Sequence, residues 1–133
     1  MLTLSEHYIQ LLRYMGIDCE VRTLKGADNP HEDTKLLVEK LRDESNVTFF
    51  SEKVSSVLTS EQFSAHFLTG YEGTQKHTLV IAGPFGWDYD IIPKTWKKLS
   101  LSPLTFTHEM AYVLLLEQLY RGAKIMKGQK YHY

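Results

Sequence analysis

The sequence holds 133 residues, the length of about one domain, and 43% of them are hydrophobic and 12% aromatic. This composition supplies an apolar core and excludes a disordered polyelectrolyte. The formal net charge of −1 excludes a protein held to nucleic acid by its overall charge alone.

The first expected element is a helix that begins after Thr3. Thr3 and Glu6 have the spacing of a capping box, apolar residues then recur on one helical face, and Gly16 ends the pattern. Apolar and polar residues alternate over residues 17–23. This alternation predicts a strand with one solvated side near the edge of a sheet.

A second helix and two short strands are expected next. Asn29 and Pro30 stand at the N-cap and first-turn positions of that helix. Residues 47–50 and 78–81 are short apolar runs that suit buried strands, and residues 60–68 between them predict a helix. The first half of the chain therefore alternates helices with strands.

The second half of the chain opens with a glycine-containing turn at residues 82–87. We expect a short helix over residues 89–99, weakened by Pro93, and then a strand over residues 99–101. The longest predicted helix spans about residues 108–126. It is apolar on more than one face, so it needs a second partner besides the sheet, which suggests a homodimer.

Strands that alternate with helices predict an α/β fold, with a mostly parallel sheet and helices on both of its faces. No repeat or linker interrupts the sequence, so residues 1–133 are expected to form a single domain. Ligands of such sheets bind beyond the carboxyl ends of the strands. The loops at residues 82–87 and 101–107 are therefore the candidate sites.

Several classes of protein and of site are disfavoured by the sequence. The longest apolar stretch, residues 111–116, is too short to cross a bilayer, and the first residues lack a basic region, so we expect a cytoplasmic protein without a membrane partner. The single cysteine, Cys19, cannot form an intrachain disulfide. No group of His, Cys, Asp or Glu has metal-ligand spacing, so no metal is expected.

Charge is unevenly distributed along the chain. Residues 94–133 hold seven Lys and Arg against two acids, a balance of +5, whereas the other 93 residues hold eight against fourteen, a balance of −6. A basic third on an acidic body suits a protein with one face that meets phosphate. Chance clustering on a solvated helix face is an equally good explanation.

Three features carry candidate chemistry, each beside a simpler explanation. Gly83 and Gly86 allow the main chain to approach a ligand, although an ordinary strand-to-helix turn has the same pattern. His108 at a helix N-terminus is expected to be neutral and able to accept a proton, or it merely caps the helix. Tyr131 and His132 follow a basic stretch and suit RNA recognition, or they belong to a frayed tail.

The most specific pattern lies in the last third of the chain. Residues 99–110 read Leu-Ser-Leu-Ser-Pro-Leu-Thr-Phe-Thr-His-Glu-Met, residues 117–126 read Glu-Gln-Leu-Tyr-Arg-Gly-Ala-Lys-Ile-Met, and the last three residues are Tyr-His-Tyr. With the loop Ala-Gly-Pro-Phe-Gly at residues 82–86, this pattern closely resembles the RlmH family, the SPOUT-class 23S ribosomal RNA pseudouridine N3-methyltransferases. The resemblance is specific over about residues 78–132 and looser before them.

The resemblance implies a homodimer that binds S-adenosylmethionine in a C-terminal trefoil knot and methylates N3 of a pseudouridine in ribosomal RNA, in the large subunit or the 70S ribosome. Its active site would be composite, with one protomer's tail reaching the other's cofactor. The implied cofactor-binding residues are Phe49, Phe50, Ala82, Gly83, Leu101, Ser102, Pro103, Leu104, Thr105 and Phe106. The implied catalytic residues are His108, Arg121, Tyr131 and His132, and Lys124, Lys127 and Lys130 would hold RNA phosphates.

The sequence departs from the family pattern in four places. It opens at a helix where the family has a strand, so a four-stranded sheet is expected. Ala82 replaces a glycine, Thr107 a proline and Tyr112 an arginine. Two alternatives stay open: a shortened, non-catalytic relative that dimerises and binds RNA or cofactor, and a flavodoxin-like domain for a small ligand, which the α/β pattern alone permits.

Overall fold

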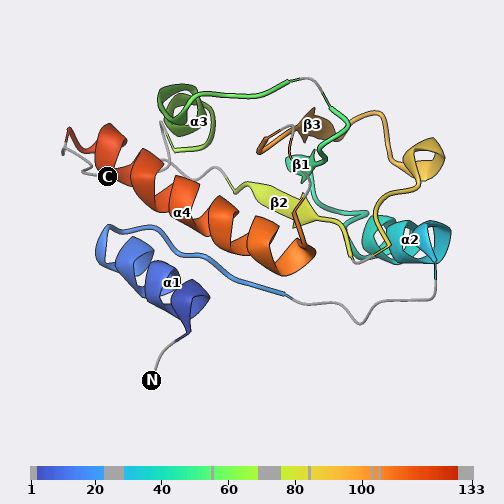
Figure 1. Ribbon diagram of the computed structural model, residues 1–133, viewed down its shortest axis with the longest axis horizontal. Coiled ribbons are helices and arrows are strands. Elements are labelled where there is room, and N and C mark those ends of the chain that lie inside the picture. Colours follow the sequence, from blue (N-terminus) through green and yellow to red (C-terminus); the bar gives the residue numbers. More distant parts are fainter. Residues whose placement is uncertain are drawn as a thin grey trace. The chain divides into compact units, whose positions relative to one another are not determined.

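The computed structural model describes residues 3–22, 29–54, 56–68, 76–83, 85–102, 104 and 106–128 (Figure 1). The chain forms two compact units. The helical unit comprises Met1–Val21, Leu58–Lys76 and Glu109–Tyr133, and the sheet unit comprises Arg22–Val57 and His77–His108.

The sheet unit is built on three parallel strands: β1 (Val47–Phe50), β2 (Thr78–Ile81) and β3 (Lys97–Leu99). Their order is β2-β1-β3, so β1 is central and buried along its whole length. The parallel sheet and the predicted bounds of β1 and β2 are confirmed. β3 begins two residues earlier than predicted, at Lys97, and Ser100 continues it in a bridge to Val57.

Helix α2 (Pro30–Lys40) covers the core of the sheet unit. The Asn29 side chain accepts a hydrogen bond from the Glu32 amide at 2.8 Å, and Pro30 opens the first turn, as the sequence predicts. The buried core consists of Val47, Phe49, Val80, Trp87 and Trp96, and Leu37, Val38 and Leu41 of α2 and its cap pack against it. These α2 side chains are partly buried, and the removal of their apolar surface from water holds α2 on the sheet.

The helical unit contains α1 (Leu4–Tyr14), α3 (Ser60–Phe67) and nearly all of α4 (His108–Met126). Complete capping boxes begin α1, at Thr3 and Glu6, and α3. Helices α3 and α4 touch closely at Gly122, whose carbonyl accepts a 2.7 Å hydrogen bond from Ser64 Oγ. All three helices lie where the sequence predicts them.

Residues 17–22 do not form the predicted strand. Ile17 is buried and Cys19 is half-buried, but Val21 is 44% exposed, so burial follows the alternation in sequence only at the start of this segment. The segment pairs with no strand of the described sheet. Within the described residues the sheet therefore has three strands, and the expectation of four is wrong.

The predicted helix over residues 89–99 is also wrong. Only one 3-10 turn, η2 (Tyr89–Ile91), forms there. Pro93 has no N–H to continue a helix, and its carbonyl accepts a hydrogen bond from the Trp96 amide in a turn that leads into β3. In the part of the chain that the structure describes, no helix is long and apolar enough to span a membrane.

Candidate functional site

The carboxyl ends of the three strands meet at one edge of the sheet unit. Phe50 at the end of β1 is in register with Ile81 on one side and with Leu99 on the other. The Ser51 amide then donates to the Leu99 carbonyl at 3.0 Å. The predicted cofactor residues Phe49, Phe50, Ala82, Gly83, Leu101 and Ser102 all lie at these strand ends or directly after them. We call this region the site edge.

The glycine loop, residues 82–87, follows β2 at the site edge. The Gly86 amide donates to the Gly83 carbonyl at 3.1 Å, and Gly86 has φ +83°, a left-handed conformation that favours glycine. A Cβ on Gly83 would lie 3.1 Å from Oδ2 of the buried Asp33 in α2. Glycine at position 83 therefore lets the main chain pass close to α2.

Two aromatic residues, one at the end of the glycine loop and one just after it, tie the loop to the end of β1. Trp87 Nε1 donates to the Phe50 carbonyl at 2.9 Å, and the Tyr89 hydroxyl is hydrogen-bonded to Ser51 Oγ. Lys53 lies over the Tyr89 ring, with Nζ 5.8 Å from its centroid. These contacts therefore hold the main chain after β1 and the main chain after β2 in defined positions.

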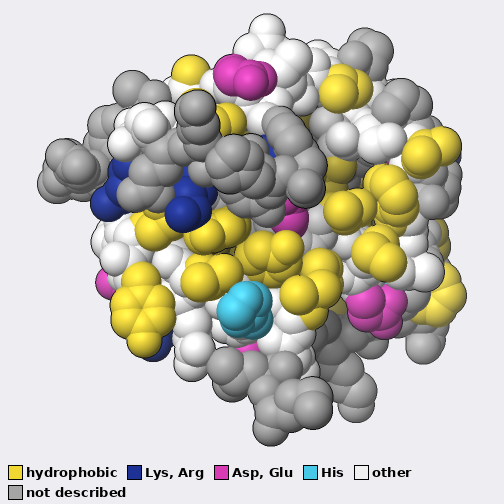
Figure 2. Space-filling model, turned by 60° about the vertical axis from the view of Figure 1, so that its left-hand side comes forward, with side chains coloured by type: hydrophobic (Ala, Val, Ile, Leu, Met, Phe, Trp, Pro, Cys, Tyr) yellow, Lys and Arg dark blue, Asp and Glu magenta, His cyan; other side chains and the backbone are white. Residues whose placement is uncertain are grey.

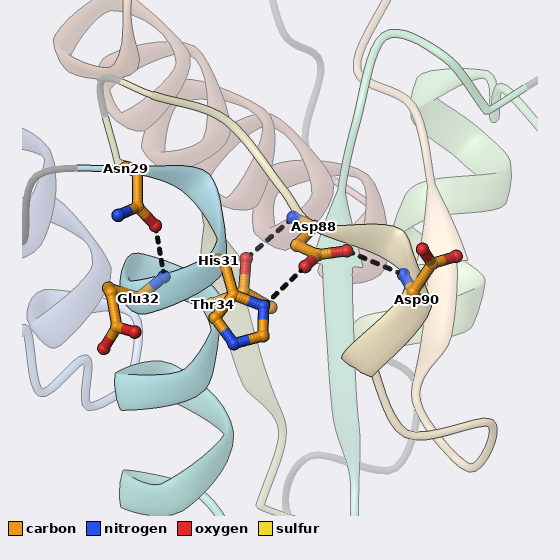
Figure 3. A network of polar contacts seen from close by, with 6 residues as sticks. All are labelled: Asn29, His31, Glu32, Thr34, Asp88 and Asp90. Atoms are coloured by element: carbon orange, nitrogen blue, oxygen red, sulfur yellow. Dashed lines mark hydrogen bonds and ion pairs between the residues drawn. The ribbon is translucent and has the colours of Figure 1, made fainter.

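Asp88 ties the same loop to the first turns of α2 (Figure 3). Its amide donates to Thr34 Oγ1 at 2.8 Å, and its Oδ2 lies 2.8 Å from His31 Nδ1. Its Oδ1 also accepts from the Asp90 amide at 3.1 Å. The hydrogen bonds from His31 and from Asp90 hold the pKa of the Asp88 carboxyl below its usual value.

The segment after β3 forms a succession of serine turns. Ser100 Oγ donates to the Ser102 carbonyl at 2.7 Å, and the Leu104 amide donates to Ser102 Oγ at 3.1 Å. Leu101 and Phe106 are half-buried and Leu104 is 67% exposed. Pro103 and Thr105 lie outside the described residues.

Main-chain polar groups, small hydroxyls and apolar side chains thus dominate the site edge. Such a surface suits a nucleoside, since main-chain groups can read the edge of a base while apolar side chains exclude water. Among the described residues, no group of His, Cys, Asp or Glu is arranged to hold a metal ion.

The two predicted catalytic residues that the structure describes, His108 and Arg121, lie far apart on one helix. His108 is exposed at the first position of α4, whereas Arg121 lies 13 positions later, about 20 Å along the same helix. Arg121 Nη2 bonds Glu117 Oε1 at 2.7 Å, and the Arg121 side chain is only 13% exposed. Tyr131 and His132 lie outside the described residues.

The predicted phosphate-binding lysines belong to the end of α4. Lys124 Nζ lies 5.6 Å from the centroid of the Tyr120 ring, and Lys127 is exposed just after the helix. Lys130 lies outside the described residues. Figure 2 turns the left-hand side of Figure 1 forward and shows Lys and Arg side chains beside a field of hydrophobic ones.

Tyr112 replaces the arginine expected from the resemblance, and it is half-buried within the helical unit. Burial raises the pKa of its hydroxyl, and hydrogen bonding with Ser5 of α1 opposes part of that rise. At this position the chain uses a packing residue in place of a surface charge.

Sequence reasoning missed the contacts that hold the glycine loop. His31 and Asp88 are 57 positions apart in the sequence, and Asp88 and Thr34 are 54 apart. The Asn29-Pro30 signal places His31 and Thr34 in the first turns of α2, but no local pattern indicates which loop they meet.

Comparison with known proteins adds independent information. A family model described as "Predicted SPOUT methyltransferase" matches residues 3–132. A relative from Kosmotoga olearia, named Ribosomal RNA large subunit methyltransferase H, is 37% identical over 96% of this chain and 87% of its own length. Relatives of the same name from Geotalea daltonii and Flavobacterium psychrophilum are 35% and 33% identical, each over 98% of this chain and 88% of their own length.

Proposed function

Because this chain belongs to the SPOUT methyltransferase family, we propose that it is an S-adenosylmethionine-dependent methyltransferase of large-subunit ribosomal RNA. The observation that carries the proposal is the site edge, where three parallel strands end together beside the glycine loop. The name shared by the relatives supports ribosomal RNA as the substrate.

The residues at the site edge fit the adenosine part of this cofactor. Gly83 lies close to α2 and has no side chain, so its main chain is uncovered at that point. The segment after β3 offers amides and apolar side chains. Ala82 and Gly83 would hold the cofactor from one side, and residues 101–106 from the other. When bound, S-adenosylmethionine supplies an activated methyl group on a sulfonium.

The acceptor that we propose is N3 of a pseudouridine. The N3–H of the base lies between two carbonyl groups and is therefore weakly acidic. It would have to lose its proton as N3 takes the methyl group that the sulfonium sulfur releases. The protein then has to position the base, exclude water and accept that proton. His108 and His132 are the candidates for proton transfer, and Arg121, Lys124, Lys127 and Lys130 would hold phosphates.

A homodimer would bring these residues together. His108 and Arg121 are separated by about 20 Å along α4, so a site that uses both needs groups from two chains. We therefore propose that Arg121, Tyr131 and His132 of one protomer face the site edge of the other. We further propose that residues 1–133 form a single domain with helices on both faces of the sheet and a C-terminal trefoil knot. The protein would act in the cytoplasm, where ribosomes are found.

Methyl transfer to ribosomes tests the function directly. Ribosomes from cells that lack this gene are incubated with the purified protein and methyl-labelled S-adenosylmethionine, and the modified nucleotide is located by mass spectrometry. We expect one methyl group on a single pseudouridine of the large-subunit RNA. Cofactor binding without any transfer to free subunits or to 70S ribosomes would contradict the proposal and favour a non-catalytic relative.

A further inference from the structure

We propose that His31 and Thr34 of α2 are positioning residues that hold Asp88 and so keep the glycine loop in the shape that binds the cofactor. These three residues form what we call the α2 latch (Figure 3). The inference rests on the proposed function, because it assigns the latch a role in cofactor binding.

The α2 latch joins helix α2, which is packed on the core, to the glycine loop, which would otherwise have more conformational freedom. Helix α2 is packed on the core through Leu37 and Val38, so its first turns have a defined position. The glycine loop contains two glycines within four residues, and glycine loses more conformational freedom on ordering than any other residue. A loop ordered before the cofactor arrives avoids that entropic cost during binding.

Both contacts of the latch are made at Asp88, two residues after Gly86. Thr34 is fully buried, and its Oγ1 accepts a hydrogen bond from the Asp88 amide at 2.8 Å. The His31 Nδ1 contact to Oδ2 of the same residue has equal length. Asp88 is thereby held at its main chain and at its side chain, so its contacts to α2 fix the end of the glycine loop.

His31 can be replaced without disturbing the buried core. Its side chain is 53% exposed and borders an open hollow of about 330 Å³, which Lys35, Val38, Glu39 and Ile91 also line. Replacing the imidazole therefore leaves the buried core in place. Thr34 is the stricter test, because valine has the same shape but cannot accept the hydrogen bond from the Asp88 amide.

Four variants separate a positioning role from a merely structural one. Thr34→Val and His31→Ala remove the hydrogen bonds, whereas Thr34→Ser and His31→Asn keep a group that can make them. We expect each of the first pair to raise the Kd for S-adenosylmethionine in calorimetry about three- to tenfold, the effect of one lost hydrogen bond, and the second pair to restore it. In the transfer assay the KM for the cofactor should rise while kcat at saturation stays within about twofold.

A matched control and a second readout keep the outcomes distinct. His7→Ala removes an exposed histidine of α1 and should bind the cofactor as the unmodified protein does. Hydrogen exchange at the Gly83 and Gly86 amides, measured without cofactor, should be faster in Thr34→Val and His31→Ala than in the two conservative variants.

If the unmodified protein fails to bind S-adenosylmethionine, the proposed function fails, while the exchange rates still report on the α2 latch. Unchanged affinity and unchanged exchange in Thr34→Val and His31→Ala would overturn the inference, as would equal losses in His31→Ala and His31→Asn.

Discussion

At Gly83 the main chain passes against the side chain of Asp33, with little room for a side chain of its own. A Cβ there would meet Asp33 Oδ2 at 3.1 Å, tighter than ordinary van der Waals contact. We expect Gly83→Ala to push the loop away from α2, destabilise the protein by about 1–2 kcal/mol and weaken cofactor binding, as measured by urea unfolding and calorimetry.

Gly16 provides the control for this substitution. It has φ +83°, and a Cβ added there would meet nothing within 4 Å, so Gly16→Ala introduces backbone strain away from the site edge. A cost of about 1 kcal/mol with unchanged cofactor affinity is expected there. Gly83→Ala protein that binds the cofactor normally would show that the close approach has no role in binding.

Asp88 gives a prediction about pH. Its hydrogen bonds to His31 and to the Asp90 amide lower the pKa of its carboxyl in the folded protein below the usual 3.8. Stability from this group is therefore complete above that usual value and is lost as the pH falls through the lower, folded-state pKa. In an NMR titration the Asp88 carboxyl of the unmodified protein should have a midpoint below 3.8, and His31→Ala should move it upward. Identical midpoints in the two proteins would show that His31 does not hold the carboxylate.

Among the elements, α3 and α4 depend on a small residue where they touch. A Cβ on Gly122 would lie 2.7 Å from Leu68 Cδ1 and 3.4 Å from Ser64 Cα, and Leu68 is fully buried. Gly122→Val should therefore destabilise the protein by about 1–3 kcal/mol in urea unfolding. Ala65→Val on the exposed face of α3 should cost only about 0.5 kcal/mol, the difference in helix propensity. Equal costs for the two variants would argue against the tight contact.

The elements that were predicted well from the sequence are those whose bounds are indicated by neighbouring residues. Capping residues such as Thr3 and Asn29 fixed the helix starts, and the apolar runs of β1 and β2 matched their strands residue for residue. The failures have a common cause, since strand pairing is not local. Residues 17–22 alternate apolar and polar residues in sequence but do not pair, whereas β3 pairs although Lys97 and Lys98 are exposed.

For the whole molecule, the grouping of the strand ends that form the candidate site could be predicted, because parallel strands end at one edge. The residues after β1, β2 and β3 were predicted on that basis and on the family resemblance, and the structure brings those strand ends side by side. The α2 latch could not be predicted, because its partners are more than 50 positions apart and neither carries a recognisable motif.

The charge asymmetry leads to a prediction about RNA binding. Each lysine that neutralises a phosphate steepens the salt dependence of binding, by about 0.7–0.9 in the logarithmic slope. Lys127 is exposed after α4, so Lys127→Ala should weaken binding to large-subunit RNA and flatten the slope by about that amount. Lys35→Ala on α2, also exposed, is the matched control and should leave the slope unchanged. A flattening in both variants, or in neither, would count against a phosphate contact at Lys127.

An NMR titration of the labelled protein with S-adenosylmethionine tests most directly whether the cofactor binds at the site edge. Saturable shifts are expected for the amides of Ser51, Gly83 and Ser102, at the ends of the three strands, with little change for Phe63 in α3. The absence of any saturable shift, or shifts confined to the helical unit, would contradict this placement of the cofactor.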